Sequence, residues 1–521
     1  MLIYNRAIFY ATFIIYPCTM KKCHTGTDLP VSFPMGKHCR PSALVLALSL
    51  ALFSMPAGSV DISKIELPDL GDSSGTLLTP VEEKELGEAF FRSLHSQIEI
   101  SQDPEIQEYI QAIGEKLVAN SDLPNQRFHF FVVMENDVNA FAGPGGYIGV
   151  NSGLILITEE ESELASVMGH EIAHVTQRHL YRAAEAQGRL SIPSMAATLA
   201  AILLGTQSPM AGQAAIMAIQ AGSVQFQIDF TRANEEEADR VGMQTLAASH
   251  FDPRSMPTFF ERLQQASRYL GNNIPEFLRT HPVTTARISD SRGRAETYPY
   301  KQYPDSLAYQ LAKAKLRVLT VTHKAEAAQY FKSRLQQGTE EQRMVDQYGL
   351  ALSETALEKF KEAEAILQSL VQKYPDQPQY ATALARNAQE QNDFPTALKR
   401  YQKLAAKYPE NQEVKLQYIS ALLKTNQVDA AKNNLQALSE ETKSQPVYWE
   451  ILSEIYSKLN QPAESHRYIA EYYYATGQIR EAIMQIHLAQ KSKGVDAYLA
   501  AILEERLHFL HTQEEHERRR Q

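Results

Sequence analysis

The chain has 521 residues, of which 44% are hydrophobic and 21% are charged, and its formal net charge at pH 7 is −10. This length and composition predict two or three globular domains, and the chain is long enough to bury a hydrophobic core. The negative charge balance, without a dense basic stripe, argues against nonspecific binding to nucleic acid or to an anionic membrane surface.

Residues 1–59 predict a signal segment for Sec export. Basic Lys37 and Arg40 precede an apolar run at residues 42–53, which is too short to span a membrane comfortably. Ala57-Gly58-Ser59 then offers a small-residue cleavage site. The segment is therefore expected to be removed after export.

Residues 1–34 make this signal unusually long, because they contain an apolar run of their own near residues 8–16. We therefore expect translation to start at Met35. N-terminal sequencing of the precursor tests this expectation, since any residue found upstream of Met35 contradicts it.

All three cysteines of the chain, Cys18, Cys23 and Cys39, precede the expected cleavage site. The mature protein would then contain neither thiols nor disulfides, which suits an oxidising compartment. No cysteine stands at the end of the signal, so a lipoprotein anchor is not expected.

A glycine-rich turn followed by a short strand is expected near residue 145. Gly143-Pro144-Gly145-Gly146 has turn chemistry, and Tyr147-Ile148-Gly149-Val150 is rich in strand-forming residues. Two alternatives follow for this strand. It is either an open edge of a sheet or part of a buried hairpin with no role in binding.

The pattern His170-Glu171-Ile172-Ala173-His174 follows this strand. On a helix, positions i and i+4 share one face, so both imidazoles can reach one ion while Glu171 lies beside it. This is the arrangement of a zinc hydrolase, in which nitrogen ligands bind Zn²⁺ at about 2.0–2.1 Å and water takes an open position. Glu171 would deprotonate that water. The alternative is a chance pair of surface histidines.

The residues before the motif predict that it lies on a helix. Thr158 and Glu161 have the spacing of a capping box, and acidic residues fill the first turn. Leu164, Val167 and Met168 then recur at helical spacing. We expect a helix with Thr158 as its cap.

Residues 191–228 contain no charged side chain and are rich in Ala, Ile, Leu and Met. The longest unbroken apolar piece, residues 195–204, falls short of the roughly 18 residues that cross a membrane. One alternative is two helices packed on the protease core. The other is a partly exposed segment that docks on a membrane-protein client or covers the zinc cleft.

A third metal ligand is expected on a second helix, within residues 234–242. Glu235 lies four residues before Asp239 and shares its helix face, whereas Glu236 and Glu237 would point elsewhere. Glu235 can bind zinc while Asp239 accepts the free N–H of a zinc-bound histidine, which fixes the tautomer of that histidine. The alternative is an acidic, solvated helix.

His281 and Arg287 follow the second helix and offer another cationic or metal-binding pair. His281 has two functional alternatives: it stabilises the oxyanion of the tetrahedral intermediate, or it binds zinc in a resting state and displaces the catalytic water. A solvated loop histidine is the third alternative. Arg287 is expected to support the ligands without binding zinc itself.

From about residue 305 the chain is rich in Ala, Leu, Gln, Lys and Tyr at helical spacing. Phe360, Phe394 and Val428 are 34 residues apart, as are Ala363, Ala397 and Ala431. This is the tetratricopeptide length. About four such helical hairpins, between residues 342 and 490, would stack into a superhelix with a concave surface. The repeats either bind a partner there or act as a structural prop.

His170-Glu171-x-x-His174 followed by Glu235-x-x-x-Asp239 resembles the minigluzincin zinc metallopeptidases, a family that includes the CAAX prenyl endopeptidases and bacterial membrane quality-control proteases. Within that family the chain is most similar to periplasmic members. They share its secretion signal, the stretch at residues 139–150 and the C-terminal repeats. The resemblance covers roughly residues 77–520. It implies a mostly helical α+β zincin-like domain with a small sheet, followed by an all-α tetratricopeptide superhelix.

The resemblance also implies roles for residues and partners. His281 would lie near the single zinc ion, and the substrate backbone would join a sheet as an added strand along Gly145, Gly146, Tyr147 and Ile148. Clients would be misassembled or stalled outer-membrane β-barrel proteins, and the repeats would dock on the barrel-assembly machinery. With the export signal, the resemblance favours the bacterial periplasm.

The expected organisation is a signal segment at 1–59, a linker at 60–76, a zinc metallopeptidase domain at 77–304 and a repeat domain at 305–521. The expected activity is zinc-dependent hydrolysis of peptide bonds inside a polypeptide. Two other classes remain open. One is a chaperone or assembly factor whose peptidase activity is latent or dispensable, and the other is a scaffold whose protease domain is only structural.

Overall fold

The structure is a computed structural model that describes residues 78–185, 232–269 and 275–518. The predicted signal segment, the start at Met35, the linker and the uncharged stretch at 191–228 lie outside the described residues. Within the described part of the chain, no helix is long and apolar enough to cross a membrane.

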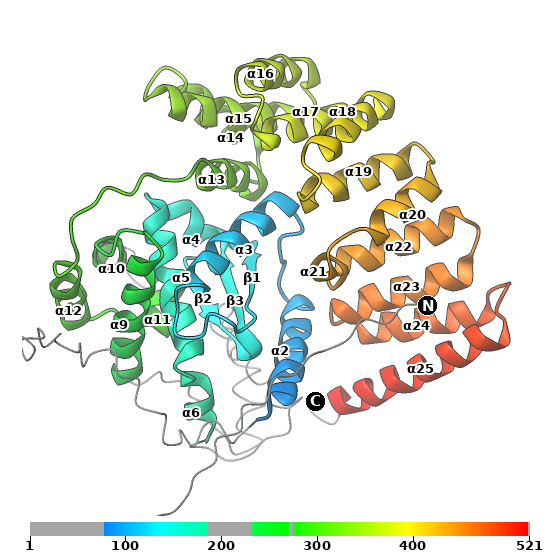
Figure 1. Cartoon of the computed structure of the whole chain (residues 1–521), viewed down its shortest axis with the longest axis horizontal. Coiled ribbons are helices and arrows are strands. Elements are labelled where there is room, and N and C mark those ends of the chain that lie inside the picture. Colours follow the sequence, from blue (N-terminus) through cyan, green and yellow to red (C-terminus); the bar gives the residue numbers. More distant parts are fainter. Residues whose placement is uncertain (1–77, 186–231, 270–274, 519–521) are drawn as a thin grey trace, which may run out of the picture. The chain divides into compact units, whose positions relative to one another are not determined.

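A three-stranded sheet lies among the helices of the N-terminal part (Figure 1). Strand β3 (Tyr147–Asn151) is central, because it pairs in parallel with β1 (His129–Val133) and antiparallel with β2 (Ala140–Ala142). The two outer strands are therefore β1 and β2. Among the described residues no strand pairs with the outer edge of β2, and β2 contacts helix α5.

The glycine-rich residues before β3 form the predicted turn. Gly145 and Gly146 have φ values of 69° and 77°, a region that residues with a Cβ atom rarely adopt. The expectation that Tyr147 and Ile148 lie on an open edge is wrong, because β3 is hydrogen-bonded to a strand on each side. For the position of this strand, the structure shows a hairpin of β2 and β3 with β1 on the other side.

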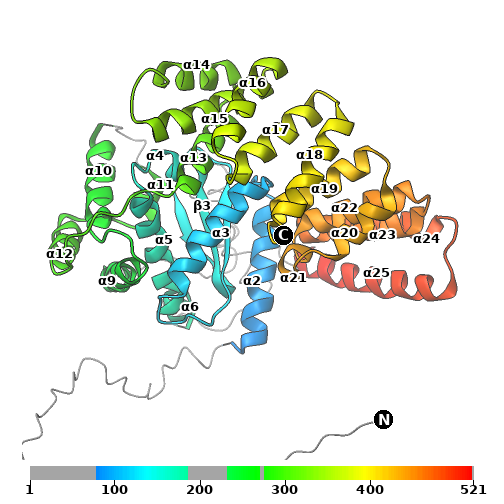
Figure 2. The same ribbon diagram turned by 45° about the horizontal axis from the view of Figure 1, so that its top comes forward.

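Helices surround the sheet, and α3 and α5 pack together against it (Figure 2). The shared core contains fully buried side chains such as Phe130, Ile148, Leu164, Met168 and Phe259. The helices of this part are α2 (Pro80–His95), α3 (Pro104–Val118), η3 (Pro144–Gly146), α4 (Ser152–Ile157), α5 (Glu161–Thr176), α6 (His179–Glu185), α9 (Arg232–Ala248), α10 (Ser255–Tyr269), α11 (Glu276–Thr280) and α12 (Thr285–Ala295).

Helix α5 carries the His170–His174 motif, as predicted, but the expected capping box is wrong. Glu160 is the N-cap residue, and its side chain makes no capping hydrogen bond. Thr158 instead ends α4: its hydroxyl donates to the carbonyl of Ile155 at 2.8 Å and lies 2.8 Å from the Tyr309 hydroxyl. The threonine side chain is used by the preceding helix and by a tertiary contact, so it cannot cap α5.

Two glycines bring α5 and α9 into close backbone contact. A Cβ atom on Gly242 would lie 2.9 Å from the backbone nitrogen of His170 and 3.0 Å from the carbonyl carbon of Gly169. Any larger side chain at Gly242 would therefore push the helices apart. The close approach places Glu235 of α9 against the histidines of α5.

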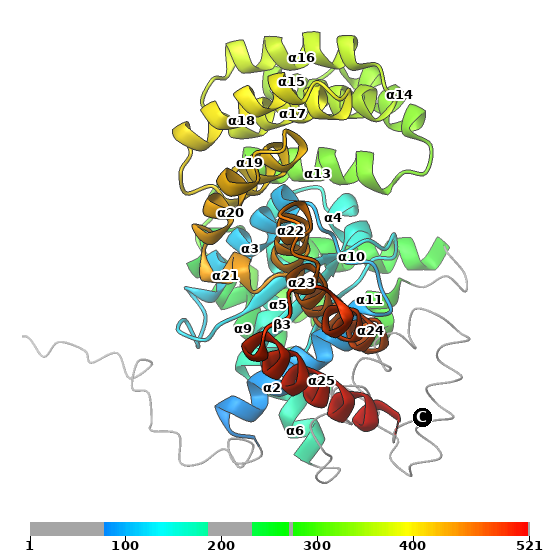
Figure 3. The same ribbon diagram turned by 90° about the vertical axis from the view of Figure 1, so that its right-hand side faces the viewer.

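The C-terminal part consists of helical hairpins, and Figure 3 shows α15, α16, α17 and α18 side by side. Its helices are α13 (Leu307–Thr320), α14 (Lys324–Arg334), α15 (Glu340–Ala356), α16 (Phe360–Lys373), α17 (Pro378–Glu390), α18 (Phe394–Lys407), α19 (Gln412–Lys424), α20 (Val428–Gln436), α21 (Glu440–Lys443), α22 (Pro446–Lys458), α23 (Pro462–Ala475), α24 (Ile479–Lys491) and α25 (Ala497–Arg518).

The 34-residue period corresponds to one hairpin. The periodic alanines Ala363, Ala397 and Ala431 are fully buried near the start of each second helix. The turn inside each hairpin uses a left-handed residue at the same spacing: Glu358, Asn392, Asn426 and Asn460 have φ values of 59°, 66°, 59° and 57°. The turn therefore recurs in four hairpins, and the buried alanine where the helices meet recurs in the first three of them.

A buried cluster of charges joins α3 to the repeats, and we refer to it as the α3 junction. Lys315 Nζ lies 2.7 Å from carboxylate oxygens of both Asp103 and Glu105, and 3.9 Å from Glu413. The Tyr348 hydroxyl donates to Glu105 at 2.9 Å. Part of the repeat surface is therefore covered by α3 of the same chain.

Candidate metal centre

Helix α5 places His170 and His174 one turn apart on a buried face. The two Nε2 atoms lie 3.0 Å from each other, and both side chains are almost fully buried. Burial lowers the pKa of His174 well below its usual value, and the charge of His170 acts in the same direction. His174 is therefore a neutral imidazole, which is the form that binds a metal.

Glu235 of α9 lies next to both histidines and is the third candidate ligand of the site. Its Oε2 lies 3.5 Å from His170 Nε2, and its Oε1 lies 3.4 Å from His174 Nε2. Burial alone would raise the pKa of Glu235, but the charge of His281 and a hydrogen bond from His170 hold it well below its usual range. This carboxylate is therefore ionised and available to a cation.

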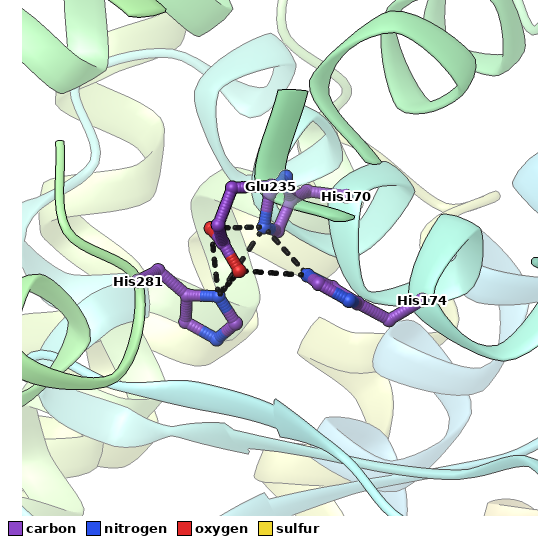
Figure 4. Close-up of side chains that lie close together, drawn as sticks. All are labelled: His170, His174, Glu235 and His281. Carbon is purple, nitrogen blue, oxygen red and sulfur yellow. Dashed lines mark hydrogen bonds and ion pairs between the residues drawn. The ribbon is translucent and has the colours of Figure 1, made fainter. Parts of the chain in front are cut away.

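His281 occupies the fourth corner (Figure 4). Its Nδ1 lies 3.4 Å from His170 Nε2 and 3.1 Å from Glu235 Oε1. Ligand atoms from His170, His174, Glu235 and His281 all lie within 4.8 Å of one another. Ligands about 2.0–2.1 Å from a tetrahedral zinc ion would be about 3.3 Å apart. The five separations of 3.0–3.5 Å given above fit such an ion, whereas the limit of 4.8 Å for the whole set is wider than an occupied tetrahedral site.

Asp239 and Arg287 support the cluster from behind. Asp239 Oδ1 lies 3.0 Å from His170 Nδ1, and Arg287 donates to both oxygens of Asp239 at 2.7 and 2.8 Å. Arg287 Nη1 also lies 2.8 Å from Glu235 Oε2. Burial would raise the pKa of Asp239, but the hydrogen bonds from Arg287 and His170 lower it. A carboxylate is thus held against the outer nitrogen of His170.

Glu171 lies beside the cluster without joining it. Its Oε1 is 3.4 Å from His281 Nε2, and the backbone of Ala142 forms a hydrogen bond with its carboxylate. Burial raises the pKa of Glu171, and the charges of His281 and His170 partly offset that effect. A carboxyl with a raised pKa next to a metal site is suited to accept and return a proton.

Strand β2 passes along the same site. Asn151 N–H donates to the Asn139 carbonyl and Gly143 N–H donates to the Tyr147 carbonyl, at 2.9 and 2.7 Å. In an antiparallel pair these bonds alternate with residues whose polar groups point outward. The backbone groups of Ala140 therefore face away from β3, although the residue is fully buried in this structure.

A small hollow lies beside His174, between the end of β2 and the end of α5. It is lined by Ala142, Gly143, His174, Val175, Arg178, Leu180 and Tyr181. Most of these side chains are apolar, so the hollow is suited to a small apolar group.

Sequence reasoning missed one buried group of this site, His179 at the start of α6. It is fully buried, and its Nδ1 lies 2.8 Å from Nδ1 of His174. Its Nε2 lies 3.2 Å from Glu237 Oε2, so Glu237 reaches the site indirectly. The spacing of His179, five residues after His174, does not place it on the same helix face, so the sequence pattern gave no signal for it.

Comparisons with known proteins agree with this geometry. The profile of Peptidase family M48 matches residues 104–295, and a tetratricopeptide repeat profile matches residues 388–455. The putative beta-barrel assembly-enhancing protease of Vibrio cholerae is 38% identical over 425 residues, which are 81% of this chain and 87% of that protein. The chain belongs to the beta-barrel assembly-enhancing protease family.

The family assignment extends to a second relative. The beta-barrel assembly-enhancing protease of Escherichia coli is 34% identical over 420 residues, covering 80% of this chain and 85% of that protein. A more distant relative, the mitochondrial metalloendopeptidase OMA1 of Schizosaccharomyces pombe, is 29% identical over 180 residues, or 34% of this chain and 50% of that protein. The chain is a metalloendopeptidase with a mostly helical M48 domain and a helical repeat region, as predicted.

Proposed function

We propose that this chain is a zinc-dependent endopeptidase of the bacterial periplasm that degrades misassembled outer-membrane β-barrel proteins. The proposal rests on His170, His174 and Glu235, whose ligand atoms lie close to one another. The Glu235 oxygens lie 3.5 and 3.4 Å from the two histidine nitrogens, which is near the spacing of ligands around a tetrahedral ion. Two nitrogens and one carboxylate oxygen are a typical ligand set of catalytic zinc.

The chemistry follows from the residues around that point. A bound zinc ion would lower the pKa of a water molecule and polarise the scissile carbonyl. Glu171 then accepts the proton of the attacking water and returns it to the leaving amine. Asp239 and Arg287 keep His170 in one orientation and one tautomer while this happens.

The substrate backbone would lie along β2. The substrate would pair with the outward-facing groups of Ala140, which are buried here, so the part of the chain that covers them must move first. The added strand would bring an extended peptide past Glu171. Peptide substrates with one N-methylated amide test this arrangement. A methyl group at a bond that joins the edge should raise KM by roughly tenfold, about 1.4 kcal/mol, and equal KM values at all positions would contradict it.

His281 would restrain the enzyme. Four protein ligands fill a tetrahedral site and leave no position for water, so His281 must leave before hydrolysis. The position of His281 as a fourth ligand also favours a second function, that of a chaperone or assembly factor with latent peptidase activity. The names of the two bacterial relatives and the presence of the repeats support a link to barrel assembly, and we propose that the repeats dock on the barrel-assembly machinery.

The test is zinc content together with cleavage of casein and of an unfolded porin. We expect one zinc per chain, a loss of about 10²–10⁴-fold in kcat for Glu171→Gln, and faster cleavage by His281→Ala. A matched control is Glu236→Gln, an exposed neighbour of the ligand Glu235. Wild type and His281→Ala that both bind zinc but never cleave would favour the assembly-factor function.

The cellular role and the location need separate tests. If Glu171→Gln still supports outer-membrane assembly in cells, degradation is not the main role. Cell fractionation checks the periplasmic location, and a mature chain found only in the cytoplasm contradicts it.

A further inference from the structure

A turn after α5 folds the chain back beneath the metal site. Arg178 adopts a φ of 56°, and α6 begins at the next residue, His179. The imidazole rings of His174 and His179 have their centroids 4.9 Å apart and are nearly perpendicular, at 75°. This places the edge of the His179 ring, rather than its face, against His174.

The hydrogen bond between the two rings fixes where their protons lie. Only one of two facing Nδ1 atoms, which are 2.8 Å apart, can carry the shared proton. His174 faces the other ligands with Nε2, so as a neutral ligand it carries its proton on Nδ1. His179 must therefore accept at Nδ1 and carry its own proton on Nε2.

The far side of His179 completes the chain of hydrogen bonds. Its Nε2 donates to Glu237 Oε2 at 3.2 Å, and Arg182 Nη1 donates to the same oxygen at 3.2 Å. The order from the ligand outwards is thus His174, His179, Glu237 and Arg182. It parallels His170, which meets Asp239 directly and Arg287 beyond it.

We propose that His179 is a positioning residue, which sets the tautomer and ring orientation of His174 and connects it to Glu237. The proposal rests on the metallopeptidase function above and assigns the support of the second histidine ligand. Groups that hold a metal-bound histidine in this way typically contribute about 10–100-fold to metal affinity. Helix α9 then supplies one ligand, Glu235, and the outer carboxylates of both histidine supports, Asp239 and Glu237.

The test separates hydrogen bonding from packing at this position. In the full chain, His179→Phe keeps an aromatic ring but has no acceptor, whereas His179→Asn has a smaller side chain with an amide oxygen near the place of Nδ1. Zinc affinity is measured by competition with a chromophoric chelator, and Co²⁺ replaces zinc as a spectroscopic probe. Circular dichroism confirms folding of each variant.

We expect His179→Phe to lose about 10–100-fold in zinc affinity and to change the visible Co²⁺ spectrum. His179→Asn should stay much closer to wild type in both. A purely structural role predicts the reverse order, with Phe tolerated better than Asn. That order, or unchanged affinity in His179→Phe, would overturn the proposal.

Glu237→Gln provides a second variant that leaves the interior intact, since Glu237 is partly exposed. We expect a smaller loss of affinity, of a few fold, while Glu236→Gln on the same helix changes nothing. If His179→Phe does not fold, equal affinities of Glu237→Gln and wild type overturn the proposal. A wild-type chain without any zinc affinity would instead overturn the metallopeptidase function itself.

Discussion

Two buried clusters of charge in this molecule differ in the source of their positive charge. The α3 junction contains its own cations: the Lys315 ammonium contacts Asp103 and Glu105 directly, and Arg386 lies 3.4 Å from Asp103. The metal centre collects Glu171, Glu235 and Asp239 around histidines. Arg287, which contacts Glu235 and Asp239, adds a permanent cation to this cluster.

This difference indicates which cluster is structural and which is functional. Burial would lower the pKa of Lys315, yet the charges of Glu105 and Asp103 raise it. The lysine therefore stays protonated, and its positive charge offsets the negative charge of these carboxylates. At the metal centre, burial would lower the pKa of His170, but hydrogen bonds to Asp239 and Glu235 raise it to about 10. The acids there favour an added positive charge, which a divalent ion can supply.

The largest expected effect comes from removing Lys315 from the junction. Lys315→Met leaves the buried carboxylate of Glu105 without a charged partner, while Asp103 keeps Arg386 at 3.4 Å. We expect a cost of about 3–5 kcal/mol. The midpoint of chemical denaturation should fall accordingly. Lys361→Met, at an exposed lysine of α16, is the matched control and should stay within about 0.5 kcal/mol of wild type.

An unchanged midpoint for Lys315→Met would mean that the junction does not depend on its buried lysine. The contrast between the two clusters would then fail.

Removing the metal should have an intermediate effect. At free zinc 100 times above Kd, binding stabilises the folded state by about 2.7 kcal/mol, so a chelator should lower Tm and added zinc should restore it. Glu235→Gln lacks one ligand, and its Tm should respond much less. A chelator that leaves the wild-type Tm unchanged would contradict a metal-dependent centre.

The smallest expected effect concerns Glu276, a buried acid that belongs to neither cluster. Neither of its oxygens has a hydrogen-bond partner among the described residues. The guanidinium of Arg279 lies 3.8 Å away. Burial raises its pKa from 4.5 to about 7, Arg279 opposes this, and Asp137 and Glu135 add to it.

The sign of the pH dependence follows from that shift. The unfolded chain loses the Glu276 proton near pH 4.5 and the folded chain near pH 7, so this carboxyl destabilises the fold increasingly between these values and constantly above them. Glu276→Gln should therefore be neutral at pH 4 and more stable than wild type by about 1–2 kcal/mol at pH 8, after allowance for solvent screening. Denaturation midpoints at both pH values measure this, and an equal gain at both would refute it.

The sequence predicted those parts of the site that follow from helical spacing. One helical turn separates His170 from His174, and one turn also separates Glu235 from Asp239. Each pair therefore shares a face of its own helix. The 34-residue repeat was visible for the same reason, since each hairpin repeats its own local pattern. Local periodicity is present in the sequence itself.

The parts that were missed depend on tertiary contacts. Thr158 has the spacing of a cap, but Tyr309, far along the chain, competes for its hydroxyl. His179 acquires its role only because the chain reverses at Arg178 and α9 packs alongside. Tyr147 has strand character in either case, and only the pairing order shows that its strand is central.

The contact between Gly169 and Gly242 has a consequence for the tolerance of the active site to mutation. The distance between α5 and α9 is set by direct contact between their backbones. The absence of a side chain at both glycines therefore determines how far Glu235 lies from the histidines. A single methyl group at Gly242 would act as a wedge, separating the ligands by a few tenths of an ångström without altering any of them. The geometry of the candidate metal site can therefore be altered at Gly242, a residue that is not one of its ligands.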